Sequence, residues 1–114
     1  MLMKGRILVG SLREFKTKKG ETLPKASVKV ADMGPECASD VITYWIDFLG
    51  DASLSQTELD SVMGEEFTID IRLARASKGS NGNAYLNVAG GAIVDASGHI
   101  VQSGLRQRQL KKAS

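Results

Sequence analysis

Apolar and polar residues alternate along most of this chain, a pattern that is typical of β-strands with one buried face. The segment 40–49 is the clearest example, because one of its two faces consists of Ile42, Tyr44, Ile46 and Phe48. Trp45, the only tryptophan, falls on the opposite face among polar neighbours. It is therefore either covered by a loop or a subunit partner, or exposed as a flat surface on which another ring could stack.

Four further segments have strand patterns, at residues 2–15, 24–30, 65–76 and 84–95. Glycines indicate a bulge or bend within the first and the last of them. Residues 99–101 would form a short sixth strand at most. A helix of about two turns is expected between the third and fourth strands, because Ser55 and Glu58 match a capping box and Gly64 is placed to end the helix.

This order of elements predicts an all-β fold with one short helix, namely the five-stranded Greek-key barrel known as the oligonucleotide-binding (OB) fold. A β-sandwich would need about seven strands, and a parallel α/β sheet would need a helix after each strand. The barrel domain is expected at residues 1–103. The polar and basic residues 104–114 have little to bury, so we expect them to form a disordered tail.

The net charge of +2 conceals a separation of charge along the chain. Residues 1–30 carry eight Lys or Arg, residues 31–70 carry ten carboxylates and no Lys or Arg, and the remaining residues are again basic. These blocks predict a basic face that attracts a polyanion, or alternatively two merely solvated surfaces. Cys37 is the only cysteine, and neither a signal peptide nor a membrane span is recognisable, so a cytoplasmic location without membrane contact is expected.

In an OB fold the ligand lies across the second and third strands, between the loop that joins strands one and two and the loop that joins strands four and five. Both loops are cationic in this chain. Cations displace the counterions of phosphates, and aromatic rings stack on unpaired bases. The candidate nucleic-acid-binding residues are Arg6, Lys16, Lys18, Lys19, Lys25, Lys29, Trp45, Arg72, Lys78, Asn81, Tyr85 and Asn87. For Tyr85, packing across the strands is the alternative role.

Enzymatic chemistry finds little support in the sequence. The only histidine, His99, and the only cysteine, Cys37, are 62 positions apart, so a His/Cys metal cluster cannot be built. The carboxylates have no ligand spacing, and the segment 78–80 lacks the spacing of a phosphate-binding loop. We therefore expect a protein that is not an enzyme and that needs no metal or cofactor.

The cationic first hairpin, the strand at 66–73 and the segment 82–88 resemble the small single-stranded-DNA-binding proteins of phages and mobile elements. The gene V type of helix-destabilising protein is the most similar in pattern, over about residues 4–95. The resemblance implies a homodimer or higher oligomer that coats single strands during DNA replication, recombination or transfer, with replication proteins as further partners. The basic tail departs from the cellular type of single-strand-binding protein, which has an acidic tip that recruits partners.

A second hypothesis from another class is a non-catalytic assembly or adaptor protein. Its copies would associate through their acidic and basic faces or dock on a replication or virion complex, with Trp45 as an interface anchor. The sequence does not distinguish DNA from RNA as the ligand, because stacking and phosphate contacts serve both.

Overall fold

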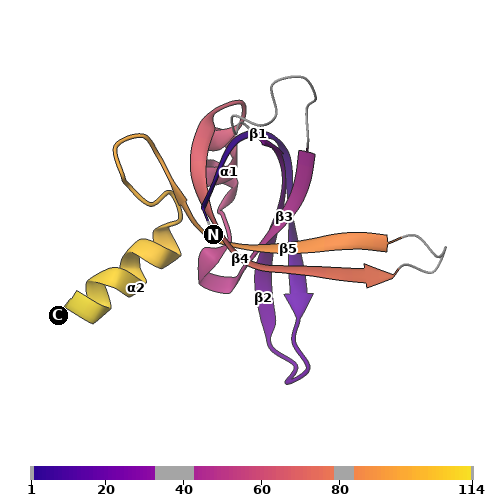
Figure 1. Ribbon diagram of the computed structural model, residues 1–114. Helices are drawn as coiled ribbons and strands as arrows, with labels where there is room; N and C mark the ends of the chain where they lie inside the picture. Colours follow the sequence, from indigo (N-terminus) through magenta and orange to yellow (C-terminus); the bar gives the residue numbers. More distant parts are fainter. Residues whose placement is uncertain (1, 33–42, 79–83, 114) are drawn as a thin grey trace.

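The computed structural model describes residues 2–32, 43–78 and 84–113, and it describes their side chains except at 73, 75–78, 84–87 and 109–113 (Figure 1). In chain order the elements are β1 (Leu2–Lys16), β2 (Thr22–Asp32), β3 (Thr43–Leu49), the 3-10 turn η2 (Gly50–Ala52), α1 (Gln56–Val62), β4 (Glu66–Lys78), β5 (Ala84–Val94) and α2 (Ser103–Ala113).

The five strands close into a barrel in the order β1-β2-β3-β5-β4, and β4 pairs with the first part of β1. All neighbours are antiparallel except β3 and β5, which run parallel. A single helix, α1, lies between β3 and β4 in the chain. The predicted OB-like barrel is therefore confirmed, with the helix at the predicted place.

The core fills the barrel with side chains that sequence alternation assigned to the inner face. Ile46 and Phe48 of β3 are fully buried, and they pack with Val28, Ile69 and others in one cluster. Leu59 and Val62 of α1 belong to the same cluster, so the helix closes part of the barrel. The predicted capping box forms as well: Ser55 Oγ accepts from the Glu58 N–H at 3.1 Å, and Glu58 Oε1 accepts from the Ser55 N–H at 3.0 Å.

Two long hairpins extend beyond the closed part of the barrel (Figure 1). In this view the β1–β2 hairpin points downward and the β4–β5 hairpin points to the right. The strand order places β3 between them, since β3 pairs with β2 on one side and with β5 on the other. β3 is thus the strand that connects the two hairpins.

Gly10 allows β1 to pass closely over α1. A Cβ atom at this position would lie 2.7 Å from Leu59 Cδ1, nearer than two carbon atoms can approach. A little earlier the pairing of β1 with β2 shifts by one residue between Ile7 and Val9. Leu8 and Val9 are consequently both exposed. The sequence predicts a bulge or bend at Gly10, and the structure has the bulge at Leu8, two residues before that position.

The C-terminal segment differs from the sequence prediction, which treated residues 104–114 as a disordered tail. Residues 103–113 form helix α2 instead. The anchor is Gln102, whose fully buried amide donates to the carbonyls of Gly91 at 2.8 Å and Ala52 at 3.1 Å. Its Oε1 accepts from the Ile93 N–H at 2.9 Å. Leu105 is also buried, so two side chains fix the start of α2 against the barrel.

Glu58 connects the two helices. Besides its role in the α1 capping box, its Oε2 accepts from the Ser103 N–H at the start of α2, at 2.9 Å. Burial acts to raise the pKa of this carboxyl, but the hydrogen bonds from Ser55 and Ser103 favour the charged form more strongly, so the pKa lies below its ordinary value. In the ranges that the structure describes, neither helix has the length and apolar composition needed to cross a membrane.

Candidate nucleic-acid interface

The outward surface of β1, β2 and β3 is the candidate interface, and we call it the β1–β3 face. Strand register arranges its side chains in three cross-strand rows: Val9, Lys29 and Trp45; Ser11, Ser27 and Asp47; and Arg13, Lys25 and Leu49. The residues between them, such as Val28 and Ile46, point into the core. The face therefore combines three cations with exposed apolar groups on a rigid sheet.

Trp45 is the main feature of this face. Its side chain is 51% exposed although it lies in the middle of the β3 strand, and its direct neighbour across the β2 ladder is Lys29. An exposed indole beside an ammonium group offers a stacking surface for a base and a charge for the adjacent phosphate. Within this single chain the ring is half exposed, whereas its burial against a subunit partner, which the sequence left open, stays a prediction.

The row of Trp45 continues onto the other hairpin. Ile46 pairs with Val88 and Asp47 with Ala89, so the parallel register places position 45 beside position 87 of β5. Asn87 in turn pairs with Arg75 of β4. Tyr85 lies two residues before Asn87 in β5 and pairs with Ser77 of β4. The register therefore extends the row of Trp45 to position 87; the side chains of Asn87 and Tyr85 lie outside the described ones, so the roles assigned to them stay predictions.

A polar cluster occupies the middle of the face. Ser27 Oγ donates to Asp47 Oδ1 at 2.8 Å, and Lys25 Nζ lies 3.7 Å from Asp47 Oδ2. The carboxylate of Asp47 therefore offsets the charge of Lys25, which the sequence prediction counted as a free cation. Lys25 remains a candidate phosphate contact, but its ammonium group has a partner on the same face.

The tip of the β1–β2 hairpin carries Lys16, Lys18 and Lys19, all of them exposed. The turn is closed by a hydrogen bond from the Thr17 N–H to the Glu21 carbonyl at 2.8 Å. Gly20 follows the lysines with a φ of 88°, the left-handed conformation that a glycine adopts easily. Within the described residues, none of these three lysines forms an ion pair, so their charges remain available to a ligand.

Two predicted arginines have acidic partners. Arg6 Nη2 lies 3.0 Å from Glu66 Oε1, and its Nη1 donates to the Gly64 carbonyl at 3.3 Å, so its guanidinium is held at the seam between β1 and β4. Arg72 Nε lies 3.6 Å from Asp70 Oδ2, although its side chain is 62% exposed. Both residues remain candidate phosphate contacts, but a carboxylate of the barrel already neutralises part of the charge of each.

Lys78 ends β4 opposite Ala84, and only its backbone is described. Asn81 lies outside the described residues. The roles assigned to these two residues therefore stay predictions.

Sequence reasoning missed several residues of the candidate interface. Val9, Ser11 and Arg13 join the β1–β3 face because the bulge after Ile7 resets which residues of β1 point outward. Arg75 was also missed, although its register places it in the row of Trp45. These residues alternate with apolar residues in β1 and β4, which could have indicated that they point outward. Alternation alone, however, does not predict which residues of the neighbouring strands lie beside them.

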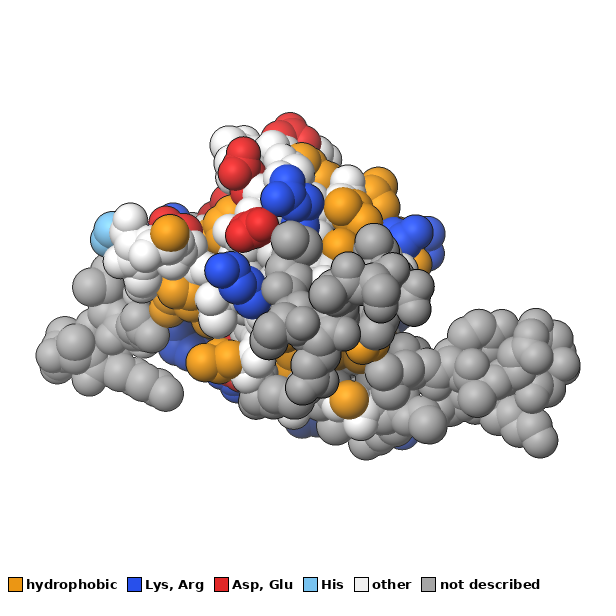
Figure 2. All heavy atoms as spheres, turned by 45° about the horizontal axis from the view of Figure 1, so that its top comes forward, with side chains coloured by type: hydrophobic (Ala, Val, Ile, Leu, Met, Phe, Trp, Pro, Cys, Tyr) orange, Lys and Arg blue, Asp and Glu red, His pale blue; other side chains and the backbone are white. Residues whose placement is uncertain are grey.

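Charges of opposite sign are interspersed on the side of the molecule drawn in Figure 2, where Asp and Glu side chains lie directly beside Lys and Arg side chains near the top. The acidic block of the sequence contributes Asp51, Glu58 and Asp60, which lie on or next to α1. The described side chains include no group of three His, Cys, Asp or Glu placed to hold a metal ion.

No protein-family model, curated protein or solved structure matches this chain. The resemblance to the single-stranded-DNA-binding proteins of phages and mobile elements rests on the sequence pattern.

Proposed function

We propose that this protein binds single-stranded DNA with little dependence on sequence and protects it, as in the replication, recombination or transfer of a phage or mobile element. The observation that carries the proposal is the half-exposed Trp45 on β3, directly across from Lys29 and between two hairpins. A strand laid across β2 and β3 would pass over this ring. The function involves no covalent chemistry and no cofactor.

Two kinds of interaction would bind the single strand, namely ion pairs with phosphates and stacking on bases. The lysines of the β1–β2 tip and the cations of the β1–β3 face neutralise phosphates and release their counterions, which makes the affinity depend steeply on salt. The indole stacks on a base whatever its identity and contributes roughly 1–3 kcal/mol. Neither interaction reads a base sequence, so both support a sequence-tolerant binder.

The test is the affinity of the full chain for a fluorescently labelled oligo(dT) over a series of salt concentrations. The expected result is a linear fall of log K with log salt, with a slope equivalent to several phosphate contacts at about 0.7 per contact. An oligonucleotide with a mixed sequence should bind similarly, and a duplex of the same length more weakly. The proposal fails if oligo(dT) does not bind at low salt.

A second candidate, an assembly or adaptor protein, is favoured by a separate observation. Five large apolar side chains of β1 are exposed, namely Leu2, Leu8, Val9, Leu12 and Phe15. Exposed apolar groups on one strand suit a protein partner, which includes a second copy of this chain. Gel filtration with and without oligo(dT) separates the candidates: the assembly role predicts oligomers that form without DNA and, because salt does not screen apolar contacts, persist as salt rises.

A further inference from the structure

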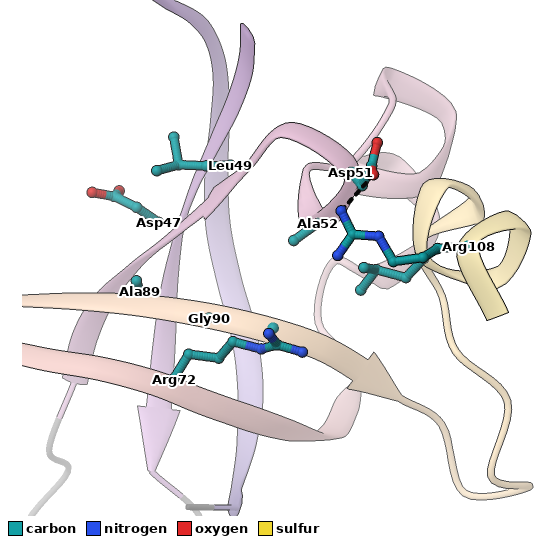
Figure 3. Close-up of a pocket in the computed structure, with 10 residues that line it drawn as sticks. Asp47, Leu49, Asp51, Ala52, Arg72, Ala89, Gly90 and Arg108 are labelled. Atoms are coloured by element: carbon teal, nitrogen blue, oxygen red, sulfur yellow. Dashed lines mark hydrogen bonds and ion pairs between the residues drawn. The ribbon is translucent and has the colours of Figure 1, made fainter. Parts of the chain in front are cut away.

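A hollow of about 180 Å³ lies where β5 meets the start of α2, and we call it the β5–α2 hollow (Figure 3). Five elements line it, since β3, η2, β4, β5 and α2 all contribute residues. It opens on the same outward surface as Trp45, because Leu49 lines it and lies four residues beyond Trp45 on the same face of β3. Four residues of strand span about 13 Å.

The lining is flat and partly apolar. β5 contributes Ala89, Gly90 and Gly91, which present backbone and a single methyl group. The side chain of Arg72 lies against Gly91, since a Cβ atom at this position would be 2.5 Å from Arg72 Nε. Leu49, which is 39% exposed, adds an apolar wall. A planar group could lie in this hollow without displacing a side chain from β5.

The charges around the hollow are balanced. Arg108 Nη2 bonds Asp51 Oδ2 at 2.7 Å, and Arg72 Nε lies 3.6 Å from Asp70 Oδ2. Asp47, also in the lining, is paired with Lys25 outside it. Because each cation has a carboxylate partner, the hollow has no excess positive charge to attract an isolated phosphate. The guanidinium groups still offer flat surfaces, on which bases stack well.

The size of the hollow narrows the choice of ligand. Pockets for drug-sized molecules and cofactors start at roughly 300 Å³, so a hollow of about 180 Å³ suits a single ring. We propose that the β5–α2 hollow receives one base of the bound single strand, stacked against Arg72 and Leu49. This inference rests on the proposed function and adds a second base subsite to Trp45. It also gives α2 a role, because Arg108 and Leu105 form the wall opposite β5.

The test compares two ligands of equal length, oligo(dT) and a fully abasic phosphodiester, on the parent chain and on Ala89→Met. Methionine at this position fills the hollow and leaves every charge in place. We expect Ala89→Met to weaken oligo(dT) binding by roughly 10-fold, the effect of losing one stacked base. Binding of the abasic chain and the salt slope should stay as in the parent.

Ala92→Met is the matched control, because it makes the same change on the same strand but in a different hollow, beside Leu2 and Ile100. It should bind both ligands like the parent. If Ala89→Met melts well below the parent, Leu49→Ser replaces it, since this variant removes the exposed apolar wall and should show the same selective loss.

The outcomes separate the two claims. Equal weakening of both ligands by Ala89→Met would assign the hollow to the phosphate backbone and overturn the base subsite, while the proposed function stands. Unchanged binding by both hollow variants would also overturn the subsite alone. Failure of the parent chain to bind oligo(dT) would overturn the subsite and the proposed function together.

Discussion

The α1–α2 end of the barrel and the β1–β3 face differ in how their side chains are used. Side chains at the helical end form hydrogen bonds within the chain, whereas several on the sheet are exposed to solvent. At the helical end, the amide of Gln102 makes three hydrogen bonds within the chain, and the carboxylate of Glu58 accepts from the backbone N–H groups of Ser55 and Ser103. On the sheet, Trp45 and the lysines of the hairpin tip are exposed. The first set stabilises the fold, and the second set is exposed and contacts the strand under the proposed function. Mutations should therefore separate stability from binding.

The largest effect should come from Gln102→Leu. The change leaves the Ile93 N–H and the carbonyls of Gly91 and Ala52 without their buried partner. Buried groups without partners cost about 1–3 kcal/mol each, so we expect a loss of about 3 kcal/mol or more in the free energy of unfolding. Unfolding in denaturant measures this change in the free energy of unfolding. Gln107→Leu, on the exposed side of α2, is the control and should change stability by less than about 0.5 kcal/mol. Equal stability of the two variants would contradict this role of Gln102.

Trp45→Ala, in contrast to Gln102→Leu, should weaken oligonucleotide binding and change the free energy of unfolding little. We expect the affinity for oligo(dT) to fall by roughly 10-fold, because one stacked base is lost. Trp45→Phe keeps an aromatic surface and should recover most of the affinity. Titration with labelled oligonucleotide measures both. A variant that binds like the parent would remove Trp45 from the interface.

Glu58→Gln should cost about 1 kcal/mol of stability, as the loss of a helix cap does, and should leave oligonucleotide binding unchanged. Since the folded protein lowers the pKa of Glu58, the carboxylate contributes fully above the ordinary value of 4.5 and loses its contribution as the pH falls through the lower, folded pKa. The stability difference between the parent and Glu58→Gln should therefore shrink below about pH 4.5. Unfolding curves at pH 7 and at acid pH test this; a difference that grows in acid would contradict it.

Lys18→Ala should have the smallest effect. The lysine is exposed at the hairpin tip, so its removal should leave stability unchanged and reduce the salt slope of binding by about one contact. Lys18→Arg keeps the charge and should keep the slope. If Lys18→Ala retains the parent's slope as well, the tip does not contact the strand.

Much of the barrel could be predicted from the sequence because its signals are local. Alternation identified the strands, and the Ser55–Glu58 capping box with Gly64 marked the single helix between the third and fourth of them. Their order then favoured one architecture. The same alternation placed Trp45 on the polar face of its strand but left open whether the ring is covered; in the structure its side chain is 51% exposed.

The rest depends on contacts that local pattern does not encode. The bulge after Ile7 changes which side chains of β1 face outward, so the sequence did not place Arg13 on the β1–β3 face. Helix α2 was missed because its anchor is polar: Gln102 is buried by three hydrogen bonds to backbone that is distant in sequence. The pairing of Asp47 with Lys25 likewise requires the β2–β3 register.

The emission of Trp45 during titration of the parent chain with unlabelled oligo(dT) tests the central claim most directly, because the chain has a single tryptophan. At low salt the account predicts quenching that saturates with added oligonucleotide and is reversed when salt is raised. Emission that stays unchanged while the oligonucleotide binds would show that no base stacks on Trp45, and emission that stays unchanged because nothing binds would contradict the proposed function itself.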